Sequence, residues 1–200
     1  MRLVIASNNA HKIREIREML GGMFDEVISM AEAGIDLDVV EDGTTFMENA
    51  LKKAHEVHAL LPDDAVLSDD SGLSVDALGG APGVYSARFA LDGHDDSANR
   101  QKLLRELRGV PDNERSARFE CAMVLCRKGV KDIVCLGKVE GRILFEERGE
   151  NGFGYDSLFY YEPAKLSFAE MTAEAKNHIS HRHMALQGVL DELAKEGGAS

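Results

Sequence analysis

Residues 2–20 read RLVIASNNAHKIREIREML, in which a short apolar run stands directly before a helical pattern. Residues 3–5 are the β-type run, and the small polar residues 7–9 break it. The apolar positions that follow have the spacing of one helix face and are Ile13, Ile16 and Leu20. Gly21-Gly22 then ends the helical pattern. A strand that leads straight into a helix indicates an α/β fold.

Strand and helix patterns alternate along the rest of the chain. We expect further strands at residues 24–29, 65–68, 115–127, 133–136, 139–145 and 158–161. We expect further helices from the capping-box pair Thr45 and Glu48 to Pro62, over 97–108 and over most of 168–195. Residues 115–145 predict an antiparallel meander, and 72–94 a long structured loop. The predicted fold class is α/β with a mixed sheet, without a division into independent domains.

Composition and charge exclude several classes of protein. The chain has 200 residues, 44% of them hydrophobic, which suffices for a substantial core in one domain or two tightly joined lobes. Its 23 Lys+Arg and 35 Asp+Glu give a net charge of −12, and duplex nucleic acid needs a basic face instead. The apolar runs are far shorter than the ~20 residues that span a bilayer. We therefore expect neither a nucleic acid nor a membrane partner.

The cysteines and the first residues bear on the compartment. Cys121, Cys126 and Cys135 have no C-x-x-C spacing and stand in apolar stretches, which is typical of small buried hydrophobic residues under reducing conditions. A structural zinc or disulfide role is the minority alternative. Residues 1–6 lack the basic lead and long apolar run of a signal peptide. Together these features favour the cytoplasm.

Three stretches could bind phosphate or a cation. Ser7–Lys12, between strand and helix, offers backbone N–H groups, a helix dipole and a lysine, although an ordinary N-cap is the alternative. Asp69 and Asp70 follow an apolar strand, where one carboxylate could face a metal or water; an Asx-type turn before Gly72 is the alternative. Glu41 could complete a magnesium site, or merely be solvated.

Two later stretches could bind a nucleobase. Gly152–Asp156 flanks an aromatic ring with glycines and adds a carboxylate acceptor, although a β-turn with a core Phe fits equally well. Residues 176–183 hold a lysine, an arginine and three histidines, an unusual concentration of hydrogen-bond donors in an acidic chain. A metal site at these histidines is the minority alternative.

The ordered set of motifs resembles the inosine triphosphate pyrophosphatase family over residues 3 to about 190. The carrying stretches are Ser7–Lys12, Glu41 with Gly43–Ala50, Ser68–Leu73, Gly79–Arg88, Gly152–Asp156 and Ser180–Arg182. Each motif is weak alone, but their order is specific. Two departures are Ser157, where the family usually has Pro, and Asn8, where it often has Gly; neither removes a functional group.

The resemblance implies an elongated α/β fold of two lobes with a cleft between them, forming one domain over residues 1–200, and a homodimer. It implies Mg²⁺-dependent hydrolysis of ITP, dITP and XTP to the monophosphate and pyrophosphate. Glu41 and Asp70 would hold Mg²⁺, and Asp70 would accept the proton of the attacking water. The remaining substrate contacts that it implies are Ser7, Asn8, Asn9, Ala10, His11, Lys12 and Lys53 for the triphosphate, Ser71, and Phe153, Gly154, Tyr155, Asp156, Lys176, His181 and Arg182 for the base. Two alternatives remain open: a pyrophosphatase for other modified nucleotides, and a nucleotide-binding protein without turnover.

Overall fold

The computed structural model describes residues 2–20, 22–90 and 95–197, so Gly21 and residues 91–94 of the expected loop lie outside the described residues. Its strands are β1 (Arg2–Ile5), β2 (Glu26–Ser29), β3 (Ala65–Val75), β4 (Ser116–Cys126), β5 (Ile133–Ile143), β6 (Phe159–Tyr161) and β7 (Leu166–Ser167). Its α-helices are α1 (Ala10–Leu20), α2 (Phe46–Leu60), α3 (Asp96–Glu106), α4 (Ala173–Ile179) and α5 (His181–Gly197). Short 3₁₀ turns η1 (Asp76–Leu78), η2 (Gly83–Arg88), η3 (Asp112–Glu114) and η4 (Phe168–Glu170) connect them.

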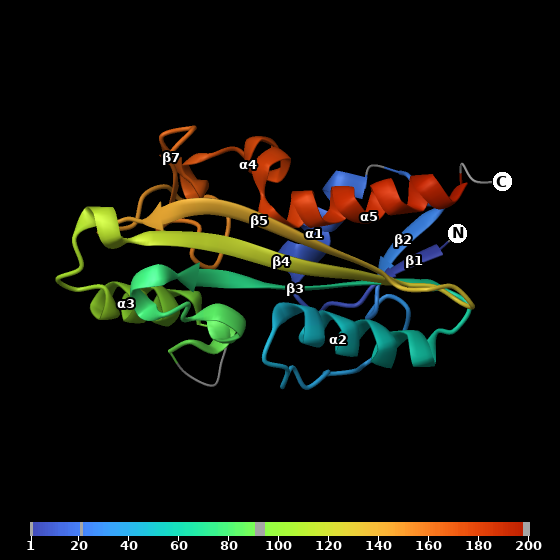
Figure 1. Ribbon diagram of the computed structural model, residues 1–200. Coiled ribbons are helices and arrows are strands. Elements are labelled where there is room, and N and C mark those ends of the chain that lie inside the picture. The colour runs from blue at the N-terminus through green and yellow to red at the C-terminus, as the bar shows by residue number, and fades with distance from the viewer. Residues whose placement is uncertain (1, 21, 91–94, 198–200) are drawn as a thin grey trace. The chain divides into compact units, whose positions relative to one another are not determined.

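The described strands form one mixed sheet in the order β2-β1-β3-β4-β5-β6-β7 (Figure 1). Strand β1 pairs in parallel with β2 and β3, whereas β5 with β6 and β6 with β7 pair antiparallel. The parallel pairs need crossover connections, which α1 and α2 supply. This confirms the predicted α/β class and the mixed sheet.

The chain divides into two compact units. Unit 1 comprises Met1–Asp70, Cys121–Gly137 and Arg182–Ser200, and unit 2 comprises Ser71–Glu120 and Lys138–His181. Strands β3, β4 and β5 each contribute residues to both units.

Unit 1 has three layers. One face of its sheet packs against α1 and α5, where Ile16 and Leu186 join Leu3, Leu67 and Met123 in one apolar cluster. The other face packs against α2 in two smaller clusters, whose fully buried members are Val4, Ala6, Val57, Val66, Ala50, Ala54, Ala122 and Val124. Because successive residues of a strand point to opposite faces, the strands of unit 1 contribute side chains to the clusters on both faces of the sheet.

Unit 2 has its own core around aromatic rings. Phe119, Phe159 and Phe168 lie with ring centroids 4.6 to 5.8 Å apart and pack with Leu103 of α3 and Val139 of β5. Such tilted and offset ring pairs stabilise a core beyond the area that they bury. This core supports the segments around residues 153–156 and 176–181.

Two predicted boundaries were wrong. Strand β3 continues through residues 69–75, beyond the predicted end at Ser68 and into the predicted loop over 72–94. Both aspartates are buried there with partners, Lys12 and Arg182 for Asp69 and Asn49 for Asp70. The strands predicted at 133–136 and 139–145 are one strand, β5, which Gly137 does not interrupt. In the described residues no helix is long and apolar enough to cross a membrane.

Candidate active site

Asp69 and Asp70 point to opposite faces of β3, as neighbours in a strand must. Asp69 follows the alternation of Leu67 and points to the α1 and α5 layer, whereas Asp70 follows Val66 and points to the α2 layer. The two carboxylates therefore have different partners and different chemistry.

Asp69 lies in a buried charge cluster with side chains from α1 and α5, which we call the Asp69 cluster. Nε and Nη2 of Arg182 each lie 3.3 Å from Asp69 Oδ2, and Nζ of Lys12 lies 3.1 Å from the same oxygen. Arg182 Nη1 also donates to Glu15. Asp69 is 1% exposed, and Glu15 and Arg182 are also buried.

Electrostatics keep the Asp69 cluster charged. Burial acts to raise the pKa of Asp69, but the positive charges of Lys12, Arg182 and Lys53 outweigh it and hold that pKa far below its ordinary value. Burial likewise acts to lower the pKa values of Lys12 and Arg182, but nearby carboxylates together outweigh it, so both values are raised. These carboxylates are Asp69, Asp70 and Glu41 for Lys12, and Asp69 and Glu15 for Arg182. An aspartate held so firmly as an anion is a poor proton acceptor, and its role is to position Lys12 and Arg182.

Asp70 has the opposite character. Its Oδ2 accepts a hydrogen bond of 3.0 Å from Asn49 Nδ2, and the residue is 5% exposed. Burial raises the pKa of Asp70 above its ordinary value, against the lowering effect of Lys12 and Lys53 and with a further raising effect from Glu41. A carboxylate with a raised pKa is a stronger base, so Asp70 is the better candidate for accepting a proton.

The N-terminus of α2 positions Asn49 against Asp70. Thr45 and Glu48 form the predicted capping box, with Thr45 Oγ1 accepting from Glu48 N at 3.1 Å. Gly43 N donates to Asn49 Oδ1 at 2.8 Å, and a Cβ at Gly43 would lie 2.7 Å from that oxygen. Glycine is therefore required at 43 for Asn49 to keep its place.

Glu41 and Lys53 form an ion pair, and both residues interact electrostatically with Asp70. Lys52 pairs with Asp42 at 2.7 Å instead of with Glu48, whose carboxylate serves the capping box. Glu41 and Asp70 supply the hard oxygen ligands that Mg²⁺ prefers, and two protein carboxylates suffice where substrate phosphates and water complete the coordination.

The loop from Ser7 to Lys12 is a capped helix start. Asn9 Oδ1 accepts from the backbone N–H groups of His11 at 3.0 Å and Lys12 at 3.2 Å, and Ser7 Oγ accepts from Asn9 N at 3.1 Å. These three amides, expected to be available to phosphate, thus have partners within the chain. Asn8 is exposed and donates to Leu37 O at 3.3 Å, and Ala10 is the first residue of α1.

In unit 2, Phe153, Asp156 and Lys176 form a second cluster, which we call the Asp156 cluster. Asp156 Oδ2 accepts from Lys176 Nζ at 2.6 Å and from Phe153 N at 2.9 Å. Nζ of Lys176 lies 4.9 Å from the centroid of the Phe153 ring. Gly152 has φ +76°, and a Cβ there would lie 2.1 Å from Asp156 Oδ2. The turn thus holds a half-buried aromatic ring beside a lysine.

The other unit 2 candidates are held by the surrounding core. Tyr155 is buried and donates to Ser86 O at 2.8 Å, so it fixes the turn on η2. Gly154 N donates to Asp96 of α3 at 2.8 Å. His181 stacks on Phe119 with ring centroids 4.9 Å apart, and Ser71 lies in β3, half-buried.

Arg182 has a role in unit 1 that the motifs did not predict. Its Nε, Nη1 and Nη2 donate to Asp69 and Glu15. Motif reading missed the roles of Glu15 and Asn49. No local signal identifies them, because the burial that marks Asn49 as a residue with a specific hydrogen-bond partner is known only from the fold.

Comparison with known proteins places this geometry in a family. Residues 3–192 match the Ham1 family, and the chain belongs to it. A dITP/XTP pyrophosphatase of Clostridium perfringens is 49% identical over 197 residues, which cover 96% of this chain and 97% of the relative. Another of that name from Bacillus subtilis is 46% identical over 184 residues, covering 92% of each chain.

Solved structures agree. The Ham1 protein of Staphylococcus aureus has a TM-score of 0.87 and 39% identity, covering 98% of this chain and 100% of its own. A nucleoside-triphosphatase / dITP/XTP pyrophosphatase of Mycobacterium abscessus has a TM-score of 0.76 and 37% identity, covering 95% of this chain and 99% of its own. The expected fold family is thereby confirmed.

Proposed function

We propose that this chain hydrolyses non-canonical purine nucleoside triphosphates, namely ITP, dITP and XTP, to the monophosphate and pyrophosphate. The observation that carries the proposal is Asp70, a buried carboxylate with a raised pKa that interacts with Lys12, Lys53 and Glu41. The names of the relatives support the substrate class.

In the proposed reaction, Asp70 accepts a proton from water as the water oxygen attacks the α-phosphorus. The bond from that phosphorus to the oxygen bridging to the β-phosphate breaks, and pyrophosphate leaves with the electron pair. Lys12 and Lys53 offset negative charge on the triphosphate, the former held in place by Asp69. Asn49 orients Asp70 through its hydrogen bond.

Mg²⁺ is the proposed cofactor, held by Glu41 and Asp70. When bound, it would supply positive charge against the phosphate oxygens. The oxygen donors of Glu41 and Asp70 suit this ion, and the positive charge would favour the ionised form of Asp70.

The test of the proposed function is a substrate panel. We expect pyrophosphate release from ITP, dITP and XTP with Mg²⁺, far slower release from ATP and GTP, and loss of turnover when the metal is chelated. Equal rates for ITP and ATP would contradict the selectivity. Faster release from dUTP or dTTP would favour a pyrophosphatase of another specificity, and tight ITP binding without release would favour a non-catalytic binder.

Unit 2 is proposed to supply the base-recognising residues Phe153–Asp156, Lys176 and His181. Hypoxanthine and xanthine present a 6-oxo acceptor, which suits the donors of Lys176 and His181, whereas adenine presents an amino group there. Asp156 occupies one donor of Lys176, which fixes the direction of the lysine side chain.

Replacing Lys176 with Met should weaken this discrimination. One lost hydrogen bond of about 1–3 kcal/mol corresponds to an about 5–150-fold smaller ratio of kcat/KM for ITP over ATP. We use the ratio of kcat/KM for ITP over ATP as the readout, because partial unfolding would lower the two kcat/KM values by the same factor. Lys138→Met, at an exposed lysine of the same unit, is the matched control. An unchanged ratio in Lys176→Met would remove Lys176 from base recognition.

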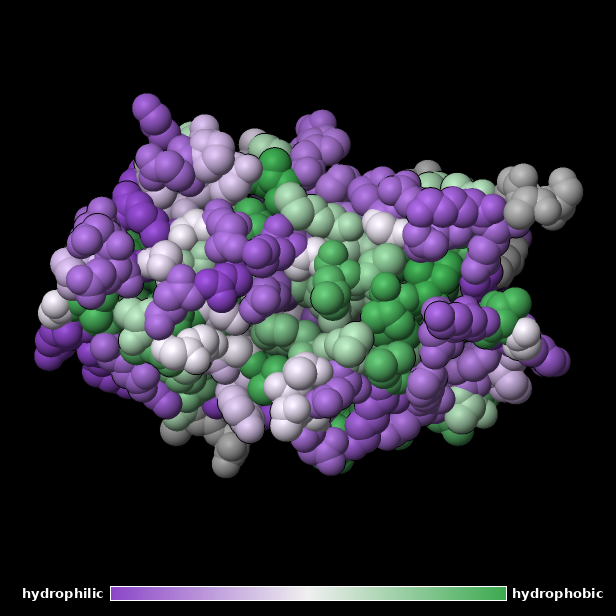
Figure 2. Space-filling model, viewed as in Figure 1, coloured by the Kyte–Doolittle hydropathy of each residue, from purple (hydrophilic) through white to green (hydrophobic). Residues whose placement is uncertain are grey.

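We further propose a homodimer that acts in the cytoplasm, without nucleic acid or membrane partners. Exposed apolar side chains of unit 1 support an interface: Leu136 is 71% exposed and Val134 38% exposed on β5. Figure 2 displays hydrophobic surface between α2 and α5. A monomeric mass by light scattering at micromolar concentration would contradict the dimer.

A further inference from the structure

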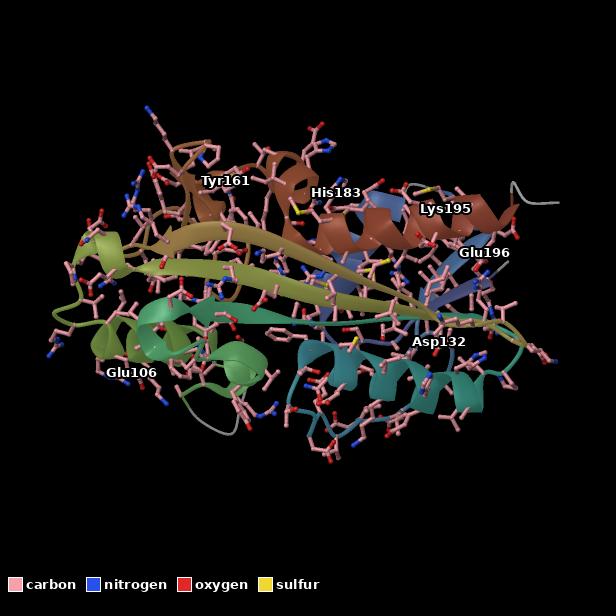
Figure 3. All side chains as sticks on the ribbon, in the orientation of Figure 1. Glu106, Asp132, Tyr161, His183, Lys195 and Glu196 are labelled. Carbon is pink, nitrogen blue, oxygen red and sulfur yellow. The ribbon has the colours of Figure 1, made fainter. Side chains whose placement is uncertain are left out.

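Three side chains with metal-binding atoms meet in unit 1 outside the proposed active site. His55 comes from α2 and Cys126 ends β4. Asp132, which is labelled in Figure 3, lies in the connection between β4 and β5. His55 Nε2 lies 2.6 Å from Asp132 Oδ2, and ligand atoms of all three residues lie within 4.8 Å of one another. In the described part of the chain this is the one group of its kind.

The donor set distinguishes this group from a magnesium site. It offers one imidazole nitrogen, one sulfur and one carboxylate oxygen, which is a combination that Zn²⁺ accepts and that Mg²⁺ does not favour. Ligand atoms around tetrahedral Zn²⁺ lie about 3.3–3.8 Å apart, given metal–ligand distances of about 2.0–2.3 Å. To reach that geometry, His55 Nε2 and Asp132 Oδ2 would move slightly apart, and the sulfur of Cys126 would move closer to both.

We propose that His55, Cys126 and Asp132 form a binding site for a thiophilic divalent cation, with Zn²⁺ as the representative ion. Water would fill the fourth position, as it does in zinc sites with three protein ligands. The site is independent of the proposed hydrolysis, because none of its ligands belongs to the Asp69 cluster, to the pair Glu41 and Asp70, or to the Asp156 cluster.

The three side chains differ in their exposure to solvent, and this difference suits a cation site that opens to the surface. The side chains of His55 and Asp132 are 57% and 28% exposed, so an ion can enter from solvent, while Cys126 is 1% exposed and closes the inner side. The same burial argues against Cys126 as a nucleophile, since a substrate could not reach its sulfur. The cluster is also more than a surface ion pair of His55 and Asp132, because the buried sulfur of Cys126 belongs to it.

The proposed ion would connect α2 to the β4–β5 connection. These segments are 77 residues apart between His55 and Asp132, so a shared ion would restrict the unfolded chain and stabilise the folded one. Helix α2 also carries Asn49 and Lys53, which precede His55 by six and two residues. We therefore expect the ion to stabilise the helix that positions Asp70.

The experiment uses the full chain with excess Mg²⁺ present, so that the carboxylates of the proposed active site are occupied. We expect one Zn²⁺ per chain by calorimetry and a Tm rise of about 5–10 °C at about 100 times the dissociation constant. Co²⁺ should give a sulfur-to-cobalt charge-transfer band in the near ultraviolet. Absence of stoichiometric binding, or a Co²⁺ spectrum without that band, would overturn the proposal.

Variants locate the ion. His55→Ala and Asp132→Asn should each weaken Zn²⁺ binding by at least about tenfold, and Cys126→Ser should remove the charge-transfer band. The matched controls are His178→Ala, at an exposed histidine, and Cys135→Ser, at a half-buried cysteine, and neither should change binding. Zn²⁺ binding that persists in His55→Ala but is lost in Glu41→Gln would place the ion at the acidic site and overturn the proposal. Failure of the substrate panel would leave this result unaffected.

Discussion

Asp70→Asn is expected to lower kcat by about 10²–10⁴-fold, the range that loss of a general base typically causes. The substitution removes the proton acceptor and one proposed metal ligand while keeping the shape of the side chain. Lys12, Lys53 and the Asp156 cluster remain, so nucleotide binding should be largely retained. Single-turnover kinetics and ITP binding to the variant would measure the two effects separately.

Stability provides a second readout for the same variant. Because burial raises the pKa of Asp70 in the folded chain, the ionised carboxylate costs folding free energy near neutral pH. Asp70→Asn removes that cost, so the Tm should stay unchanged or rise. In the wild type with Mg²⁺, activity should fall as pH falls through the pKa of Asp70, which the bound ion would lower from its raised value, because the base must be ionised.

Asp42→Asn is the matched control for Asp70→Asn. Asp42 is exposed and lies beside Glu41 in the same loop, and its carboxylate pairs with Lys52 at the surface, so both activity and stability should be nearly unchanged. Near-normal activity in Asp70→Asn would assign the base to Asp69 instead and would refute the division of roles between the two aspartates.

Asp69→Asn is expected to destabilise the chain by about 3–5 kcal/mol, the typical effect of removing one partner from a buried ion pair. The variant leaves Lys12 and Arg182 buried with only Glu15 as a charged partner from the Asp69 cluster. Urea denaturation near neutral pH would measure the loss. Asp63→Asn, at a carboxylate that is 82% exposed, should change stability little.

The pH dependence has a defined sign. The pKa of Asp69 is lowered in the folded chain, so its contribution to stability is complete above the unfolded-state pKa of about 3.9 and is lost as pH falls through the folded-state value. The difference between wild type and Asp69→Asn should therefore shrink below about pH 4. An equal difference at pH 3 and pH 7 would show that packing, and not charge, causes the loss.

Sequence patterns predicted those elements that are determined by residues close together in the chain. The capping box of Thr45 and Glu48 starts α2 as predicted, because both partners lie within one helical turn. Alternation over residues 115–127 predicted β4, because one face of that strand is apolar and buried along its length. That face carries Ala117, Phe119, Cys121, Met123 and Leu125. The predicted burial of Cys121 and Cys126 is confirmed, and Cys135 is half-buried.

The remainder depends on partners that are distant in sequence. The strand predicted over residues 65–68 continues through Asp69 and Asp70, because Arg182, 113 residues away, offsets the charge of Asp69. The role of Asn49 likewise depends on Asp70, 21 residues further along the chain. Local spacing carries no information about such pairs, and the assigned substrate contacts remain predictions from resemblance.

The segments of unit 1 are far apart in the chain, which affects when its charge cluster can form during synthesis. Unit 1 is assembled from Met1–Asp70, Cys121–Gly137 and Arg182–Ser200, and its Asp69 cluster is incomplete until Arg182 exists. During synthesis, Asp69 and Lys12 lack this arginine until more than a hundred further residues have been added, so their charge cluster can form only late. All residues of unit 2, which ends at His181, precede the last segment of unit 1.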